Sequence, residues 1–162
     1  NPCPCGFAGA PGRTCSCPTN VPERYKKRIS GPLRDRIDLS ITMPRVPPAA
    51  LVADSPAEDS ATVAARIAEA HRIARLRQAG RLNGRLSGDE LRAMVRLDSA
   101  TRRHVVALAE LERASGRGTE RILRVARTIA DLDGAGSVST GHLDEAAWFR
   151  SSDHRAADAR AV

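Results

Sequence analysis

The residues best placed for chemistry are four cysteines, Cys3, Cys5, Cys15 and Cys17, which are all the cysteines in this 162-residue chain. They form two Cys-x-Cys pairs separated by nine residues that include several glycines and prolines. Such a segment can fold back and place four thiolates around one tetrahedral ion, which leaves no open coordination position. We therefore expect a structural zinc site. Unligated thiols, redox chemistry and disulfides are the alternatives, and disulfides are disfavoured in the cytoplasmic compartment that we expect.

A second group is the basic segment 28–39, Arg-Ile-Ser-Gly-Pro-Leu-Arg-Asp-Arg-Ile-Asp-Leu. Its three arginines and two aspartates surround a Gly-Pro pair, and a short apolar strand is expected to follow. A guanidinium group matches the geometry of a phosphate in a bidentate fork, so arginines fixed at the start of a strand suit an anionic partner. The alternative is a solvated basic turn with incidental ion pairs.

A third group lies in the segment 119–127, Thr-Glu-Arg-Ile-Leu-Arg-Val-Ala-Arg, which places Arg121, Arg124 and Arg127 at a spacing of three near the start of a predicted helix. Cations there oppose the helix dipole unless an anion lies nearby. A solvent-facing stripe of arginines is the alternative. The four histidines are far apart in the sequence and are interpreted as structural, and no hydrolase triad is apparent.

The composition favours closely packed helices that bind something anionic. Aromatic residues make up 2% of the chain, so the core must consist of Leu, Ile, Val and Ala. The net charge is +7, and residues 1–46 hold eight Lys and Arg residues against three acidic ones. A basic surplus of this kind favours a nucleic acid or another anionic partner. No apolar run is long enough to span a bilayer, so no membrane partner is expected.

The pattern of turns divides the chain into four parts. Residues 1–46 contain the cysteine-rich segment, a helix from Asn20 to Ser30, and a strand over residues 37–43. Residues 47–60 are rich in Pro, Ala and Ser and predict a linker. Residues 61–150 predict a helical domain, and residues 151–162 lack an apolar period and predict a disordered tail.

Five helices are predicted in the helical domain from capping residues and apolar spacing. The first begins at Ser60 and ends at Gly80, with Val63, Ile67, Ala70, Ala74 and Leu76 facing inward. The other starts are predicted at a capping box formed by Ser87 and Glu90, at Asp98 or Ser99, at Thr119, and at Ser139 or Thr140. Trp148 and Phe149 at the end are expected to cap the core; the alternative for them is ligand stacking.

Three motifs together resemble the C-terminal third of the magnesium-chelatase-like AAA+ ATPases of the ComM/YifB competence family. They are Asn-Pro-Cys-Pro-Cys-Gly at 1–6, the basic segment at 28–39, and Arg-Ile-Leu-Arg-Val-Ala-Arg-Thr-Ile-Ala-Asp-Leu at 121–132. The resemblance spans about residues 1–150. It implies the last strand of a truncated α/β AAA+ core followed by a helical lid, which makes the chain mainly α-helical.

The resemblance also implies roles for particular residues in a hexameric, ATP-driven DNA motor that promotes branch migration during natural transformation. Asn1 resembles the sensor 1 asparagine, which orients the attacking water. Arg36 resembles the arginine finger, which reaches into the nucleotide site of a neighbouring subunit, and Arg121 resembles the sensor 2 arginine, which the lid places on the phosphates. Arg124 is a weaker candidate for a phosphate contact. The remaining weaker candidates, for support or partner contacts, are Arg28, Arg34 and Arg127.

The sequence lacks two motifs expected of this family, since it has no Gly-x-x-x-x-Gly-Lys-[Ser/Thr] phosphate loop and no apolar strand that ends in paired acids. ATP and Mg²⁺ are therefore expected to bind only in a full-length protein, and this chain alone should be inactive. Two other interpretations remain open. One is a stand-alone, zinc-stabilised nucleic-acid-binding module, and the other is the ATPase subunit of a metal chelatase.

Overall fold

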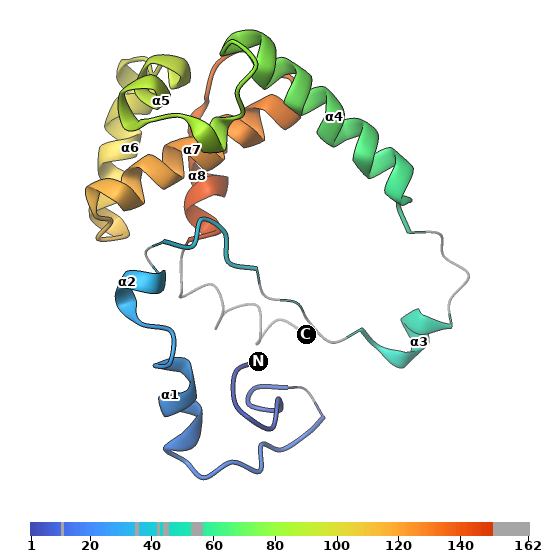
Figure 1. Cartoon of the computed structure of the whole chain (residues 1–162). Coiled ribbons are helices and arrows are strands. Elements are labelled where there is room, and N and C mark those ends of the chain that lie inside the picture. The colour runs from blue at the N-terminus through green and yellow to red at the C-terminus, as the bar shows by residue number, and fades with distance from the viewer. Residues whose placement is uncertain (11, 35, 42, 44–45, 53–56, 151–162) are drawn as a thin grey trace. The chain divides into compact units, whose positions relative to one another are not determined.

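The computed structural model describes residues 1–10, 12–34, 36–41, 43, 46–52 and 57–150 (Figure 1). The chain divides into two compact units. The described residues within Asn1–Val52 are called the cysteine unit, and those within Ala53–Arg150 are called the helical unit. The tail predicted for residues 151–162 lies outside the described residues. The described helices include none that is long and apolar enough to cross a membrane.

The cysteine unit contains three short helices, α1 (Val21–Lys26), α2 (Gly31–Arg34) and α3 (Pro48–Leu51). Helix α1 forms where a helix was predicted, but Asn20 does not cap it, because its backbone is already helical and its side chain makes no capping hydrogen bond. The Gly-Pro pair begins α2 and does not form an open turn. Ser30 lies just before α2, and its hydroxyl accepts a hydrogen bond from the backbone N–H of Leu33 at 3.3 Å.

The strand predicted over residues 37–43 is not confirmed. Its described part, residues 37–41 and 43, is irregular backbone with no ladder of hydrogen bonds. Its apolar side chains are exposed, with Ile41 at 59% and Met43 at 84%. A strand is stable only when a neighbouring strand pairs with it and a face is buried, and the described part of the cysteine unit offers no such neighbour.

The helical unit contains the five predicted α-helices and one short 3₁₀ helix. They are α4 (Ser60–Arg77), η1 (Asn83–Arg85), α5 (Gly88–Val95), α6 (Ser99–Leu111), α7 (Gly116–Leu132) and α8 (Thr140–Trp148). The capping box at the start of α5 is confirmed, and Asp98 and Ser139 cap α6 and α8 as predicted. Ser60 is the first residue of α4 and not its cap, and the predicted start of α7 at Thr119 was wrong. Asp59 caps α4 through the N–H of Thr62 at 2.7 Å, and Ser115 caps α7 through the N–H of Gly118 at 3.1 Å.

Helix α7 is the centre of the helical unit, since it packs against α4, α5, α6 and α8 (Figure 1). The core is aliphatic, as the composition predicted. Its buried members are Leu86, Leu91, Val95, Val105, Leu108, Ile122, Leu123, Ala126, Ile129, Ala130, Val138, Leu143, Ala146 and Ala147. Phe149 packs against this core, whereas Trp148 is 40% exposed and meets the Phe149 ring edge-on, with 5.1 Å between ring centroids.

Helix α4 departs from its predicted inward face. Of the five apolar residues expected to point inward, only Ala70 and Ala74 are buried. Ile67 is 44% exposed and Leu76 is 73% exposed. Figure 1 shows the reason, since the first half of α4 extends beyond the helices of the bundle. The helical period predicted the helix but not how much of it would find a neighbour.

Helix α7 ends in a Schellman motif whose glycine is needed for its conformation. Gly134 has a φ of 67°, and the N–H of Ala135 donates to the carbonyl of Ala130 at 2.8 Å. We expect Gly134→Ala to lower the free energy of unfolding by about 1 kcal/mol, because a side chain disfavours this left-handed backbone. Urea unfolding followed by circular dichroism measures the change.

Gly136 is the matched control, because it lies in the same loop, has no left-handed φ, and an added Cβ would meet nothing within 4 Å. Gly136→Ala should change the free energy of unfolding by less than about 0.5 kcal/mol. Equal losses in the two variants would show that backbone conformation is not the cause.

Candidate metal centre and arginine sites

The four cysteine sulfurs lie together in the cysteine unit. The Sγ atom of Cys3 is 3.3 Å from that of Cys5 and 3.7 Å from that of Cys15, and the Cys5 and Cys15 sulfurs are 3.6 Å apart. The Cys17 sulfur completes the group, and all four sulfurs lie within 4.8 Å of one another. Zn–S bonds of 2.3 Å in a tetrahedron place the sulfurs about 3.8 Å apart. The spacing of these thiols therefore fits a single zinc ion.

The local backbone explains how two short Cys-x-Cys pairs converge. Gly6 takes a left-handed φ of 82°, and its N–H donates to the Cys3 carbonyl at 3.1 Å, which reverses the chain after the first pair. The N–H of Ala8 then donates to the Cys3 sulfur at 3.3 Å. Cys3 is fully buried, although the unit has no aliphatic core around it. N–H groups directed at sulfur are the contacts that orient thiolate ligands.

The environment gives the cysteine thiols different pKa values. The backbone N–H of Phe7, together with the thiol of Cys3, lowers the pKa of Cys5 to about 5. The backbone N–H of Cys17 lowers the pKa of Cys15, but burial and hydrogen bonds with neighbouring thiols outweigh it and raise that pKa to about 12. The Cys5 thiol therefore ionises more readily than the Cys15 thiol, and a bound zinc ion would displace the protons that remain on the cluster.

The basic side chains of the cysteine unit lie at its surface. Arg36, the predicted finger, is exposed, and its backbone N–H donates to the Leu33 carbonyl at 3.0 Å. Arg28 stacks on the Tyr25 ring at 5.6 Å, and Asn1 is exposed. The side chain of Arg34 lies outside the described part of the structure. Arg36 is thus held on the backbone turn that follows α2.

The three arginines of α7 do not form one solvent-facing stripe. Arg121 is half-buried, and Arg124 is half-buried and donates to the Leu86 carbonyl at 3.2 Å. Arg127 is completely buried, so of its two predicted roles, support or a partner contact, the partner contact was wrong. Each step of three residues rotates the side-chain direction by about 60° less than a full turn of the helix. Two such steps, from Arg121 to Arg127, place Arg127 on the face that points to the interior.

Arg127 belongs to a buried polar cluster centred on Asp131. The Nε and Nη2 atoms of Arg127 donate to Oδ1 of Asp131 at 3.1 and 2.9 Å. Arg77 at the end of α4 donates to both Asp131 oxygens at 2.5 and 2.8 Å, and Asn83 donates to Oδ2 at 2.8 Å. Burial raises the pKa of Asp131, but the hydrogen bonds from Arg77 and Asn83 and the charge of Arg127 outweigh it, so the pKa lies below its ordinary value.

Arg117 was not among the predicted site residues, because the helix was predicted to start at Thr119. The structure places Arg117 in the first turn of α7, where its side chain is exposed. The signal that could have found it was Ser115, since a serine with Gly116 and Gly118 behind it is as good a cap as Thr119. Arg117 therefore joins Arg121 as a cation near the start of α7.

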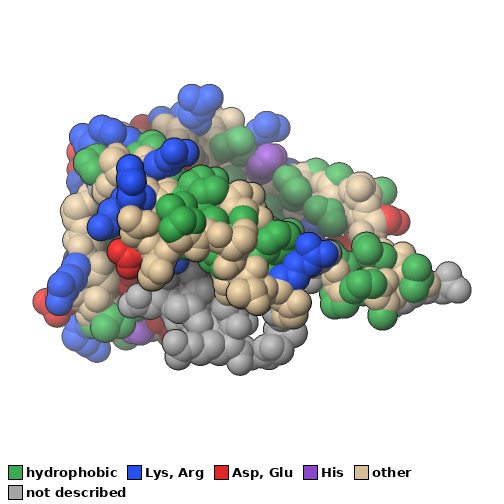
Figure 2. Space-filling model, turned by 90° about the horizontal axis from the view of Figure 1, so that it is seen from below, with side chains coloured by type: hydrophobic (Ala, Val, Ile, Leu, Met, Phe, Trp, Pro, Cys, Tyr) green, Lys and Arg blue, Asp and Glu red, His purple; other side chains and the backbone are tan. Residues whose placement is uncertain are grey.

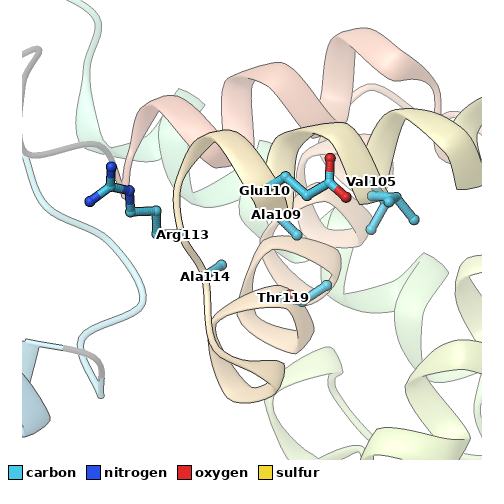
Figure 3. A pocket seen from close by; sticks show the side chains of 7 residues that line it. Val105, Ala109, Glu110, Arg113, Ala114 and Thr119 are labelled. Carbon is cyan, nitrogen blue, oxygen red and sulfur yellow. The ribbon is translucent and has the colours of Figure 1, made fainter.

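A shallow cavity of about 490 Å³ lies on the outer side of α6, where this helix turns into α7 (Figure 3). Its lining consists of Val105, Val106, Ala109, Glu110, Arg113, Ala114 and Thr119. Figure 3 shows the Arg113 side chain directed away from the other labelled residues. The apolar lining and the carboxylate of Glu110 do not suit a phosphate. Basic side chains are elsewhere prominent on the surface, with acidic ones interspersed, as the face in Figure 2 shows.

Comparison with known proteins covers both units. Residues 57–150 match the family described as "Magnesium chelatase, subunit ChlI C-terminal", and residues 1–51 match "Magnesium chelatase, subunit ChlI". YifB of Salmonella typhimurium is 38% identical over 154 residues, which cover 94% of this chain and 30% of the relative. An uncharacterised protein of Mycobacterium tuberculosis is 37% identical over 158 residues, which cover 96% of this chain and 31% of the relative.

The competence protein ComM of Haemophilus influenzae is 34% identical over 152 residues, which cover 93% of this chain and 29% of the relative. The chain thus spans about three tenths of the length of the curated relatives it matches. The motifs at 1–6 and 28–39 lie within the residues of the second family match, and the motif at 121–132 lies within those of the first. The chain therefore belongs to the magnesium-chelatase family of AAA+ proteins, in the group that includes YifB and ComM.

Proposed function

We propose that this chain supplies the phosphate-sensing arginines and the helical lid of a hexameric AAA+ ATPase that moves branched DNA. In this proposal Arg36 is the arginine finger, Arg121 is the sensor 2 arginine with Arg124 beside it, and Asn1 is the sensor 1 residue. Phosphoryl transfer needs positioning and cations more than covalent help from the protein. Side chains of these types, placed around a transferring phosphate, would stabilise its charge.

The proposal rests on how α7 is packed and on where its arginines lie. This helix is held by packing on four other helices, and it carries Arg117 and Arg121 within its first two turns. Cations at that end of a helix oppose the helix dipole, and a bound anion would offset this effect. A rigid helix with this feature is suited to a lid that closes on the phosphates of a nucleotide.

The cysteine cluster completes the proposal as a structural element. The described part of the cysteine unit has no aliphatic core, and four thiolates around zinc would hold its backbone in the way that a core holds a larger domain. Cys3, Cys5, Cys15 and Cys17 would be the ligands. The zinc ion would fix shape and would take no part in ATP hydrolysis, because no coordination position is left open.

The nucleotide and its Mg²⁺ are proposed to bind to a phosphate loop that this sequence does not contain. DNA is the proposed substrate for two reasons. One similar relative is a competence protein, and residues 1–46 carry a surplus of five positive charges. The first of these reasons also makes us prefer a DNA motor to the ATPase subunit of a chelatase.

Substitution of the α7 arginines tests the proposal. In the full-length ATPase, Arg121→Ala should lower ATP turnover by at least about tenfold, because a cation aimed at the transferring phosphate is lost. Steady-state hydrolysis assays measure the turnover of the variant, and titration with a fluorescent nucleotide measures its affinity for the nucleotide. Arg117→Ala is the comparison that decides which of the two arginines reaches the phosphates.

Arg85→Ala is a suitable control, because Arg85 is exposed on η1 of the same unit. This control should leave turnover unchanged within twofold, a difference of about 0.4 kcal/mol. Unchanged turnover in both the Arg117 and Arg121 variants would contradict the assignment of α7 to a nucleotide lid.

A further inference from the structure

Helix α4 is attached to the helical unit in an unusual way, because it lies outside the hydrophobic core. None of the buried core residues comes from α4. The buried residues of this 18-residue helix are Ala70 and Ala74. Each buries no more than a methyl group, so the apolar contribution to attachment is small. Of its larger apolar side chains, Ile67 and Leu76 are exposed, and Val63 and Ile73 are only partly buried and lie outside the core cluster.

Polar contacts at the end of α4 make the attachment instead. Arg77 donates to both oxygens of Asp131 and also to Oδ1 of Asn83 at 2.9 Å. Gln78, the buried residue that ends the helix, donates to the same Asn83 oxygen at 3.0 Å and to the Arg81 carbonyl at 3.0 Å. A guanidinium bound to a buried carboxylate in this fork is the strongest contact that α4 makes.

The carboxylate of Asp131 would remain satisfied if α4 moved away, whereas Oδ1 of Asn83 would lose its hydrogen bonds from Arg77 and Gln78. Asp131 would keep its two hydrogen bonds from Arg127, and Arg127 also donates to the carbonyls of Ala135 at 2.6 Å and Gly136 at 3.2 Å. The side chain of Arg77 is 18% exposed, whereas that of Asp131 is 1% exposed. Release of α4 would therefore return Arg77 to water without leaving an unpaired charge inside α7.

We propose that α4 is a separately docked arm that opens from α7 as a unit, with the Arg77–Asp131 ion pair as its latch, while α5–α8 stay folded. The charged groups that meet Asp131 are Arg77 from α4 and Arg127 from α7, and Asn83 adds a neutral donor from η1. Helix α4 is the first helix of the helical unit, so the ion pair determines whether the chain that enters this unit is held against α5–α8. This inference does not depend on the proposed ATPase function.

Hydrogen exchange on the 162-residue chain tests the proposal. In the unchanged protein, the opening that exposes amides in the second half of α4 should require less free energy than the opening that exposes the amides of α7. The free energy of the α4 opening should also depend less on the concentration of added denaturant. Arg77→Met keeps the aliphatic stem but removes the ion pair. It should speed exchange in α4 by at least about 100-fold, while amides of Leu123 and Ala126 in α7 stay protected.

Arg75→Met is the matched control, because Arg75 is exposed on the last turn of the same helix. It should leave the exchange of α4 unchanged within about threefold. The proposal is overturned if Arg77→Met leaves α4 unchanged, or if it weakens α4 and α7 equally. Equal denaturant dependence of the two helices in the unchanged protein would also overturn it, because α4 would then open only when the whole bundle unfolds.

Discussion

Replacement of Arg36 by alanine in the full-length ATPase is expected to lower ATP turnover by about 1,000-fold or more, because an arginine finger supplied in trans contributes a factor of that size. Nucleotide affinity should stay roughly unchanged, since the finger would reach the site of a neighbouring subunit and would act mainly on the charge that develops during transfer. Arg36 is exposed in the structure, so its loss should not unfold the cysteine unit. Hydrolysis assays and direct nucleotide titration separate the two quantities.

Two comparisons make this test specific. Arg24→Ala removes another exposed arginine from the same unit and should leave turnover nearly unchanged. Mixed hexamers of unchanged and Arg36→Ala subunits should lose activity more steeply than in proportion to the variant fraction, if each finger completes the site of its neighbour. A loss of nucleotide affinity with little loss of turnover would contradict the assignment of Arg36 as a finger.

The second large effect concerns the metal. Elemental analysis of the reduced chain should find about one zinc ion per chain, and a strong chelator should unfold the segment around the four cysteines. Structural zinc contributes roughly 10–16 kcal/mol of apparent binding free energy in small domains, far more than the remaining contacts of this segment can supply. The helical unit should keep its helical circular dichroism, because its core is aliphatic and lies entirely within that unit.

Single substitutions distinguish the ligands from their neighbours. Cys5→Ser should abolish stoichiometric zinc binding, whereas Ser16→Ala, which changes an exposed residue between Cys15 and Cys17, should not. Affinity should fall as the pH is lowered, since each thiol must lose a proton to bind the ion. A folded and reduced sample without metal would refute the site.

Local signals predicted the helices and the cysteine cluster well. The five α-helices of the helical unit were predicted because capping residues and apolar spacing act within a few residues of each other, and the cysteines converge because their spacing is short. Ser60 was mistaken for the cap of α4, and Thr119 for the start of α7, because Asp59 and Ser115 are equally good caps one and four residues earlier. Which of two possible caps begins a helix depends on which turn packs against the rest of the bundle, and the spacing of residues in the sequence does not contain that information.

Longer-range features could not be predicted from the sequence. The segment 37–43 has strand-forming residues, but a strand needs a partner, and pairing is a property of the fold around it. Arg127 looks like Arg121 and Arg124 in the sequence, yet it is buried because Asp131 and two loop carbonyls receive its charge. Whether an arginine faces a ligand or an internal carboxylate is decided by contacts across the bundle.

The scarcity of aromatic residues has a practical consequence for optical spectroscopy. The single tryptophan, Trp148, lies at the end of α8 in the helical unit, and the single tyrosine, Tyr25, lies in α1 of the cysteine unit. Selective excitation of indole fluorescence would therefore report on the helical unit alone, because tyrosine does not absorb at the long-wavelength edge of the indole band. The protein thus carries an intrinsic probe of the helical unit, whose unfolding can be recorded in an unlabelled sample without a contribution from the cysteine unit.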